Sequence, residues 1–113
     1  MNILDKIIAH KREELVVRKL MVTEEELGLS QYFGRTCLSL QQNLLKENAT
    51  GIIAEFKRKS PSKGYFNPYA DVLAITKAYT KFGASGISIL TDHELFGGNT
   101  EDMVKARQNE VPI

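Results

Sequence analysis

The chain has 113 residues, 42% of them hydrophobic, which is enough for one ordinary domain with its own core. Because 15 basic residues stand against 14 acidic ones, the formal charge of +1 gives no electrostatic reason to expect nucleic acid or an anionic membrane as a partner. Residues 1–20 alternate charges with aliphatics, unlike a signal peptide, and no stretch approaches the apolar length of a membrane helix. We therefore expect a cytoplasmic protein.

The amino-terminal residues predict short helices. Asn2 can cap a first helix, with Asp5 at its third helical position and aliphatic residues recurring at helical spacing. The charged residues fall largely off that apolar stripe, so we expect a helix with one solvated face, packed on the rest of the protein. Thr23 followed by Glu26 is a capping-box pattern for a second, shorter helix that Gly28 ends.

Residues 37–46 predict one more short helix, followed by a loop over residues 47–51. Cys37 is the only cysteine, which excludes an intramolecular disulfide and favours a reducing compartment. We interpret it as a buried structural residue, because a thiol without an activating partner usually behaves as a small hydrophobic group. Residues 1–50 thus form a predicted helical extension.

Strands and helices alternate from residue 51 onward. Residues 51–56 are a nearly unbroken apolar run, typical of a strand that is covered on both faces. After a polar loop over residues 58–69, Asp71 can cap a helix that Gly83 ends. Four residues are expected to share one face of this helix: Val72, Ile75, Tyr79 and Phe82.

The same order then repeats. Residues 86–91 predict a second buried strand, residues 92–98 a loop, and Asn99 the cap of another helix, while residues 111–113 resemble the start of a third strand. Such alternation implies a parallel sheet with right-handed crossovers, in either a doubly wound domain or a closed barrel. Two strands and the start of a third cannot make a stable sheet alone, and a closed barrel typically needs about 250 residues, so we expect the chain to be truncated.

Charged residues at the end of the first predicted strand are the main candidate for a site. Since side chains alternate along a strand, Glu55 and Lys57 point to one face while Phe56 points to the other. In a barrel this places the two charges inside, at the carboxyl-terminal mouth where barrel enzymes build their sites. A plain ion pair that closes the top of the barrel is an equally weighted alternative.

The loop over residues 60–64 directly follows this charged pair. It offers hydroxyls, free amides and a cation, a chemistry suited to a carboxylate or a phosphate. Arg58, Lys59 and Lys63 are equally consistent with solvated loop charges. We expect no nucleic-acid binding, because this short cluster lacks the interleaved aromatic residues of single-strand grooves.

The sequence contains no motif that predicts a bound cofactor or metal. Neither a phosphate-binding glycine loop nor a dinucleotide fingerprint follows either strand, so no nucleotide cofactor is expected. No metal is expected either, because His10 and His93 are far apart and residues 92–94 lack a ligand spacing. Phe96, in the second loop, either lines a pocket or packs against its own helix.

The run Ile-Ile-Ala-Glu-Phe-Lys-Arg-Lys-Ser-Pro-Ser-Lys-Gly at residues 52–64 closely resembles the first-strand signature of indole-3-glycerol-phosphate synthases. The resemblance extends to residues 3–7, 78–79, 88–92 and 96–98. It implies an α/β protein of the (β/α)₈ TIM-barrel type, with the amino-terminal helical extension, the first two βα units and the start of strand 3 present here. It also implies a lyase of tryptophan biosynthesis that needs no cofactor or metal and binds a small phosphorylated anion.

The implied reaction closes the ring of 1-(2-carboxyphenylamino)-1-deoxyribulose 5-phosphate, with loss of carbon dioxide and water, to give indole-3-glycerol phosphate. On matching positions, Lys57 resembles the cation that engages the substrate and Glu55 its orienting partner, both counted as catalytic. Ser60 and Phe96 resemble substrate contacts, and the amino-terminal helices resemble the family's extension near the catalytic mouth.

The family's general acid follows its third strand, its general base belongs to the fourth, and its main phosphate loops come from the seventh and eighth. None of these has a counterpart in residues 1–113, so we expect an amino-terminal fragment with little activity alone. Two alternatives stay open. One is a non-catalytic barrel fragment that folds by self-association or complementation, and the other is a different phosphate-handling barrel enzyme.

Overall fold

The computed structural model describes residues 1–113, which divide into two compact units, Met1–Thr36 and Cys37–Ile113. None of the helices combines the length and the apolar content that a membrane crossing requires.

Helices α1 (Ile3–Met21) and α2 (Glu24–Gly28) make up the first unit. The predicted caps are confirmed: the Asp5 amide donates to Asn2 Oδ1 at 2.9 Å, and the Asn2 amide donates to Asp5 Oδ2 at 3.2 Å. In α2, Thr23 Oγ1 accepts from the Glu26 amide at 3.2 Å. These bonds satisfy amides that have no partner inside the helix.

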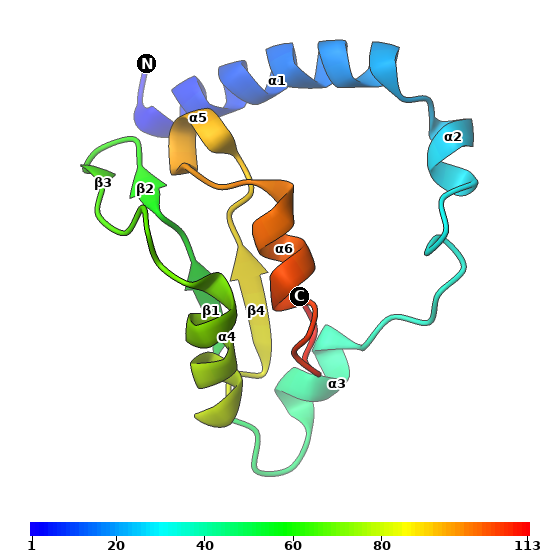
Figure 1. Ribbon diagram of the computed structural model, residues 1–113, viewed down its shortest axis with the longest axis vertical. Helices are drawn as coiled ribbons and strands as arrows, with labels where there is room; N and C mark the ends of the chain where they lie inside the picture. Colours follow the sequence, from blue (N-terminus) through cyan, green and yellow to red (C-terminus); the bar gives the residue numbers. More distant parts are fainter. The chain divides into compact units, whose positions relative to one another are not determined.

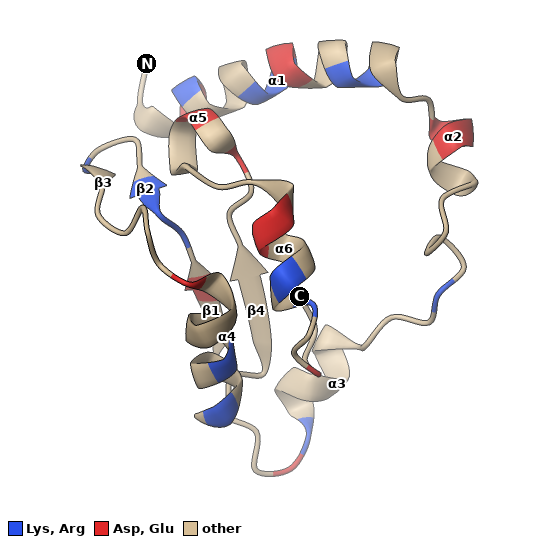
Figure 2. Cartoon of the chain, viewed as in Figure 1, with Lys and Arg blue, Asp and Glu red and all other residues tan.

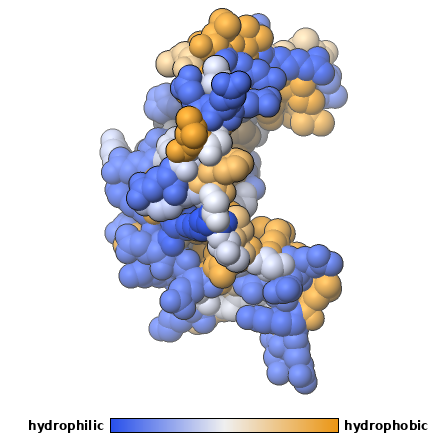
Figure 3. Space-filling view, turned by 90° about the vertical axis from the view of Figure 1, so that its right-hand side faces the viewer, coloured by the Kyte–Doolittle hydropathy of each residue, from blue (hydrophilic) through white to orange (hydrophobic).

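No residue of α1 or α2 is buried, and hydrophobic side chains lie on the surface beside charged ones (Figure 3). Ile7 is half-buried, but Leu15 is 50% exposed and Leu20 83% exposed. The helix therefore does not have the predicted single apolar stripe. At 100° per residue, Val16 and Leu20 lie on a different side of the helix from Ile3 and Ile7.

The second unit is built on two parallel strands. Strand β1 (Ile53–Phe56) pairs with β4 (Gly86–Ile89), so that Ile53 lies beside Gly86 and Phe56 beside Ile89. Helices α4 (Val72–Lys81) and α6 (Thr100–Ala106) contact each other and these strands (Figure 1). The predicted α/β class with a parallel sheet is confirmed, and the partial barrel stays a prediction.

Helix α3 (Leu40–Leu45) is shorter than the predicted span, because Ser39 caps it by accepting from the Gln42 amide at 3.1 Å. It belongs to the second unit, where Asn43 Nδ2 donates to the carbonyl of Ser85 at 3.2 Å. The domain boundary expected between residues 50 and 51 stays a prediction. Cys37 is exposed, so the expectation that it is buried is wrong.

Helix α4 begins and ends as predicted. Asp71 Oδ1 accepts from the Ala74 amide at 3.1 Å, and the chain turns away at Gly83, whose φ is 97°. Of the expected face, Val72 is buried and Ile75 and Tyr79 pack against the core, but Phe82 is 79% exposed and Thr76 is fully buried in addition. Phe82 is the C-cap, where the chain leaves the helix. The Thr76 hydroxyl tolerates burial because it donates to the Val72 carbonyl at 2.7 Å.

The core lies between the sheet and the two helices. Phe56, Val72 and Ala106 are each at most 2% exposed and form its centre. Phe56 therefore points toward the helices, as the alternation along β1 requires, and the neighbouring Glu55 is exposed.

A buried polar network joins α4 to the turn after α6. Asn109 Nδ2 donates to Thr76 Oγ1 and to the Ala106 carbonyl, both at 2.9 Å. Asn109 Oδ1 accepts from Thr80 Oγ1 at 2.9 Å. Every polar atom buried here has a partner, so the network fixes how the two helices pack.

Residues 111–113 do not form the predicted third strand. They run beside β4, where the Ile87 amide donates to the Pro112 carbonyl at 2.9 Å. Pro112 has no amide hydrogen to return such a bond, which is the physical reason that no regular ladder forms there.

Both predicted loops contain structure of their own. The loop after β1 folds into an antiparallel hairpin of β2 (Lys59–Ser60) and β3 (Gly64–Tyr65). The loop after β4 contains the short helix α5 (His93–Phe96), capped by Asp92. The Asp92 carboxylate accepts from the Leu95 amide at 2.7 Å.

Candidate functional site

The candidate site lies at the carboxyl ends of β1 and β4. Because these strands are parallel, the segments that follow them leave the same edge of the sheet. Lys57 follows β1 directly, the hairpin carries Ser60, and α5 carries Phe96.

Glu55 lies on the sheet face opposite the core. Its Oε2 accepts from the Ser88 hydroxyl at 3.3 Å, across the register of β1 and β4. Lys57 is half-buried, and no ion pair joins it to Glu55. The structure therefore does not support the alternative of a plain ion pair between Glu55 and Lys57.

Arg58 is not the solvated loop charge that the sequence left open. Its Nε and Nη2 donate to the two carboxylate oxygens of Asp102 at 2.9 Å, and the two side chains are only 12% and 5% exposed. Its Nη1 also donates to the Ala70 carbonyl at 2.8 Å, and its Cζ lies 5.0 Å from the Phe56 ring centroid. This ion pair ties the end of β1 to α6.

The hydrogen bond from Arg58 to Asp102 is the main reason that the pKa of the Arg58 guanidinium is raised above its usual value. Partial burial acts in the opposite direction, and the negative charge of Asp102 adds to the rise. Arg58 is thus held as a cation against the helix layer, on the side of β1 opposite to Glu55.

Ser60 is 9% exposed, and its Oγ accepts from the Lys63 amide at 3.2 Å inside the hairpin. A hydroxyl that accepts in this way can still donate its hydrogen to a ligand. Lys63 is exposed, in agreement with a solvated loop charge. Phe96 is half-buried at the end of α5, which fits both a pocket-lining residue and a residue packed against its own helix.

Basic and acidic residues are distributed unevenly in this unit (Figure 2). Lys and Arg follow the end of β1 into β2, and acidic residues stand at the start of α6. Arg58 and Asp102 join these two groups. No sequence pattern indicates their pairing, because 44 residues separate them.

An open cavity of about 600 Å³ lies beside the Arg58–Asp102 pair. Tyr65, Tyr69 and Lys105 are among its lining residues. None of the four predicted site residues lines it: Glu55, Lys57, Ser60 and Phe96. The predicted site residues therefore lie outside this cavity, at and after the carboxyl ends of the strands.

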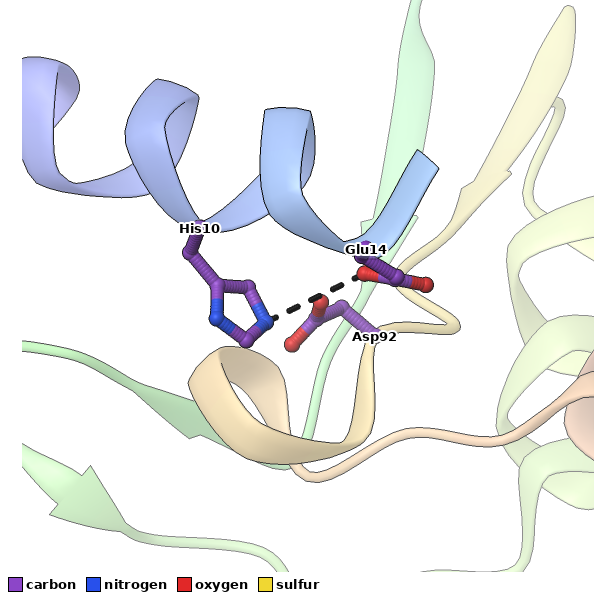
Figure 4. A group of neighbouring side chains, drawn as sticks. All are labelled: His10, Glu14 and Asp92. Carbon is purple, nitrogen blue, oxygen red and sulfur yellow. Dashed lines mark ion pairs between the residues drawn. The ribbon is translucent and has the colours of Figure 1, made fainter. Parts of the chain in front are cut away.

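The two histidines occupy different surroundings. His10 Nε2 lies 3.9 Å from Glu14 Oε2 on α1, one turn further along the helix (Figure 4). His93 is exposed in the first turn of α5.

The parallel strands, their helical crossover and the charged strand end define an α/β protein whose candidate site is built from the loops after its strands. The family model for indole-3-glycerol phosphate synthase matches residues 4–112. The chain belongs to the indole-3-glycerol phosphate synthase family.

Similar proteins agree with this assignment. The indole-3-glycerol phosphate synthase of Bacteroides thetaiotaomicron is 40% identical over 99% of this chain and 43% of its own length. That of Kineococcus radiotolerans is 38% identical over 100% of this chain and 43% of its own length. That of Exiguobacterium sibiricum is 37% identical over 100% of this chain and 42% of its own length. The chain thus spans about two fifths of the length of these relatives.

Proposed function

We propose that this chain supplies the first part of an indole-3-glycerol phosphate synthase. The reaction is the ring closure of 1-(2-carboxyphenylamino)-1-deoxyribulose 5-phosphate, with loss of carbon dioxide and water. The family match supports the activity, and the observation that carries the site is the direction of β1. Glu55 lies on the face away from the helices, and strand alternation supports the same direction for Lys57, which follows the last residue of β1.

In this proposal Lys57 binds the anionic groups of the substrate. Its half-buried ammonium has no carboxylate partner in the structure, so a ligand need not displace one. Glu55 orients the site through the Ser88 hydroxyl, which its carboxylate already holds. Ser60 donates to the substrate, and the Phe96 ring packs against the aromatic part of it.

The remaining chemistry requires a general acid and a general base, which the family resemblance assigns to segments after those matched here. We therefore expect the 113-residue chain to bind the substrate but to turn it over very slowly. The proposed setting is tryptophan biosynthesis, and the cytoplasmic location stays a prediction.

Calorimetric titration of the 113-residue chain with the substrate tests this proposal. Lys57→Met should weaken binding about tenfold or more, because a charge-assisted hydrogen bond contributes roughly 1.5–3 kcal/mol. Lys77→Met removes the same charge from the exposed face of α4 and should leave the affinity unchanged. Equal weakening by both variants, or no binding by the unmodified chain, would contradict the proposed site. Rapid formation of indole-3-glycerol phosphate would contradict the expected low turnover.

A second candidate is a piece that associates with copies of itself. The observation that favours it is the apolar surface at the start of β1, where Ile53 is 50% exposed and the preceding Ile52 is 58% exposed. Strand β1 also has only one neighbour in its sheet. Light scattering across a concentration series separates the two candidates, since a monomer that unfolds cooperatively would rule out obligate self-association.

A further inference from the structure

Lys59 connects the two segments that follow the parallel strands. It begins β2, and its Nζ donates to the Glu94 carbonyl of α5 at 2.6 Å. The same Nζ lies 5.2 Å from the ring centroid of Tyr65, the residue paired with Lys59 across the hairpin. One ammonium group thus contacts both strands of the hairpin and the helix that carries Phe96.

The packing around Gly97 supports the same connection. Gly97 ends α5 with a φ of 65°, and its amide donates to the His93 carbonyl at 2.9 Å. A Cβ at this position would lie 2.7 Å from Tyr65 Cε1 and 3.1 Å from Lys59 Cβ. The hairpin therefore rests directly on the backbone at the end of α5, at a distance that only glycine permits.

The chemistry of the contact suits a cation. Carbonyl groups in the last turn of a helix have no amide partner within it, and a lysine ammonium there satisfies them. Glu94 lies in the four-residue helix α5, so its carbonyl is one of these groups. By donating to this carbonyl, Lys59 holds the hairpin against the helix end.

We propose that Lys59 is a positioning residue that holds the β2–β3 hairpin on α5 and thereby keeps Ser60 and Phe96 within one site. Ser60 is the next residue along β2, and Phe96 lies two residues after the carbonyl that Lys59 binds. This inference rests on the proposed function only in taking Ser60 and Phe96 as substrate contacts. The hairpin and α5 should open together when the ammonium is lost.

Amide hydrogen exchange on the 113-residue chain tests the connection without any substrate. Lys59→Met retains the aliphatic stem beside Tyr65 but removes the ammonium, and should speed exchange about tenfold in both the hairpin and α5. Lys59→Arg restores a donor and should return both segments toward the unmodified rates. Lys63→Met removes a charge from the same hairpin and should change neither segment, because the Lys63 side chain is exposed. Faster exchange in only one segment, in neither, or equally in Lys63→Met would overturn the proposal.

Titration with 1-(2-carboxyphenylamino)-1-deoxyribulose 5-phosphate then separates positioning from simple stabilisation. Lys59→Met should weaken binding about fivefold while the midpoint of thermal unfolding stays within a few degrees, and Lys59→Arg should recover most of the affinity. Unchanged affinity in Lys59→Met would overturn the positioning role. If the unmodified chain does not bind the substrate, the proposed function fails, and the coupled exchange of the two segments still decides whether Lys59 joins them.

Discussion

The two units of this chain are stabilised by different kinds of interaction. In Met1–Thr36 the described bonds are local: a capping box at Asn2, a cap at Thr23, and ion pairs one turn apart around Glu14. In Cys37–Ile113 a core, a buried ion pair and a buried amide network join residues that are distant in sequence. The helices of the first unit can therefore form from local signals, whereas the core, the ion pair and the amide network give the second unit its tertiary structure.

This difference predicts how substitutions in each unit change its stability. Local caps and surface ion pairs contribute on the order of 1 kcal/mol or less, whereas a buried charge that loses its partner costs several. Substitutions in the second unit should therefore change its cooperative unfolding, and those in the first should change only nearby helicity.

Asp102→Ala should have the largest effect, because it leaves the Arg58 guanidinium buried without its carboxylate partner. We expect the free energy of unfolding of the second unit to fall by about 3–5 kcal/mol, measured by urea titration. Glu101→Ala removes the same charge from a side chain that is 75% exposed, and should cost less than about 0.5 kcal/mol. Similar losses for the two variants would contradict the role of the buried pair.

The pH dependence of this pair follows from the raised pKa of Arg58. A group with a raised folded-state pKa contributes stability that is fully present below its unfolded-state pKa and is lost as pH rises through the folded-state pKa. The contribution of Arg58 should therefore stay constant through neutral and mildly alkaline solution and disappear only in strong alkali. A loss of that contribution near neutral pH, measured as the difference from Arg58→Met, would contradict the assignment.

Asn109→Ala should have an intermediate effect. It removes the donor to Thr76 Oγ1 and the acceptor for Thr80 Oγ1 inside a packed site, and should cost about 1–3 kcal/mol. Gln108→Ala, at the exposed neighbouring position, is the control and should be close to neutral. Equal unfolding midpoints for the Asn109 and Gln108 variants would show that the network does not stabilise the unit.

Asn2→Ala should have the smallest effect. It removes the acceptor for the Asp5 amide and should cost about 1 kcal/mol of local helix stability, seen as faster amide exchange in the first turn of α1. Asp5→Asn keeps a side-chain oxygen that can accept the Asn2 amide, and should preserve more of that protection. Greater protection in Asn2→Ala than in Asp5→Asn would contradict the capping assignment.

Features that depend on neighbouring residues could be predicted from the sequence. Asn2, Asp71 and Asn99 each cap the helix that was expected to follow them. The strands at residues 53–56 and 86–89 also lie within the predicted apolar runs, and their parallel pairing follows from the helical crossover. The face of β1 that carries Glu55 was predictable as well, because side chains alternate strictly along a strand.

Features that depend on distant residues could not be predicted. Nothing near Arg58 in the sequence indicates that its partner is Asp102, and nothing near Asn109 indicates Thr76. The position of Lys59 against α5 likewise depends on how two loops pack. In the candidate site, the face of β1 that carries Glu55 was therefore predictable from the sequence. The contact of Lys59 with α5 became visible only in the structure.

Pro112 gives the two edges of the small sheet different tendencies to associate. Beside β4, a proline carbonyl already occupies the Ile87 amide, and the proline ring offers no hydrogen to an incoming strand. Strand β1 has no strand neighbour on its outer side, so its backbone can accept an added strand from another polypeptide. A strand from another polypeptide should therefore pair with β1, because the residues around Pro112 already lie along the β4 edge.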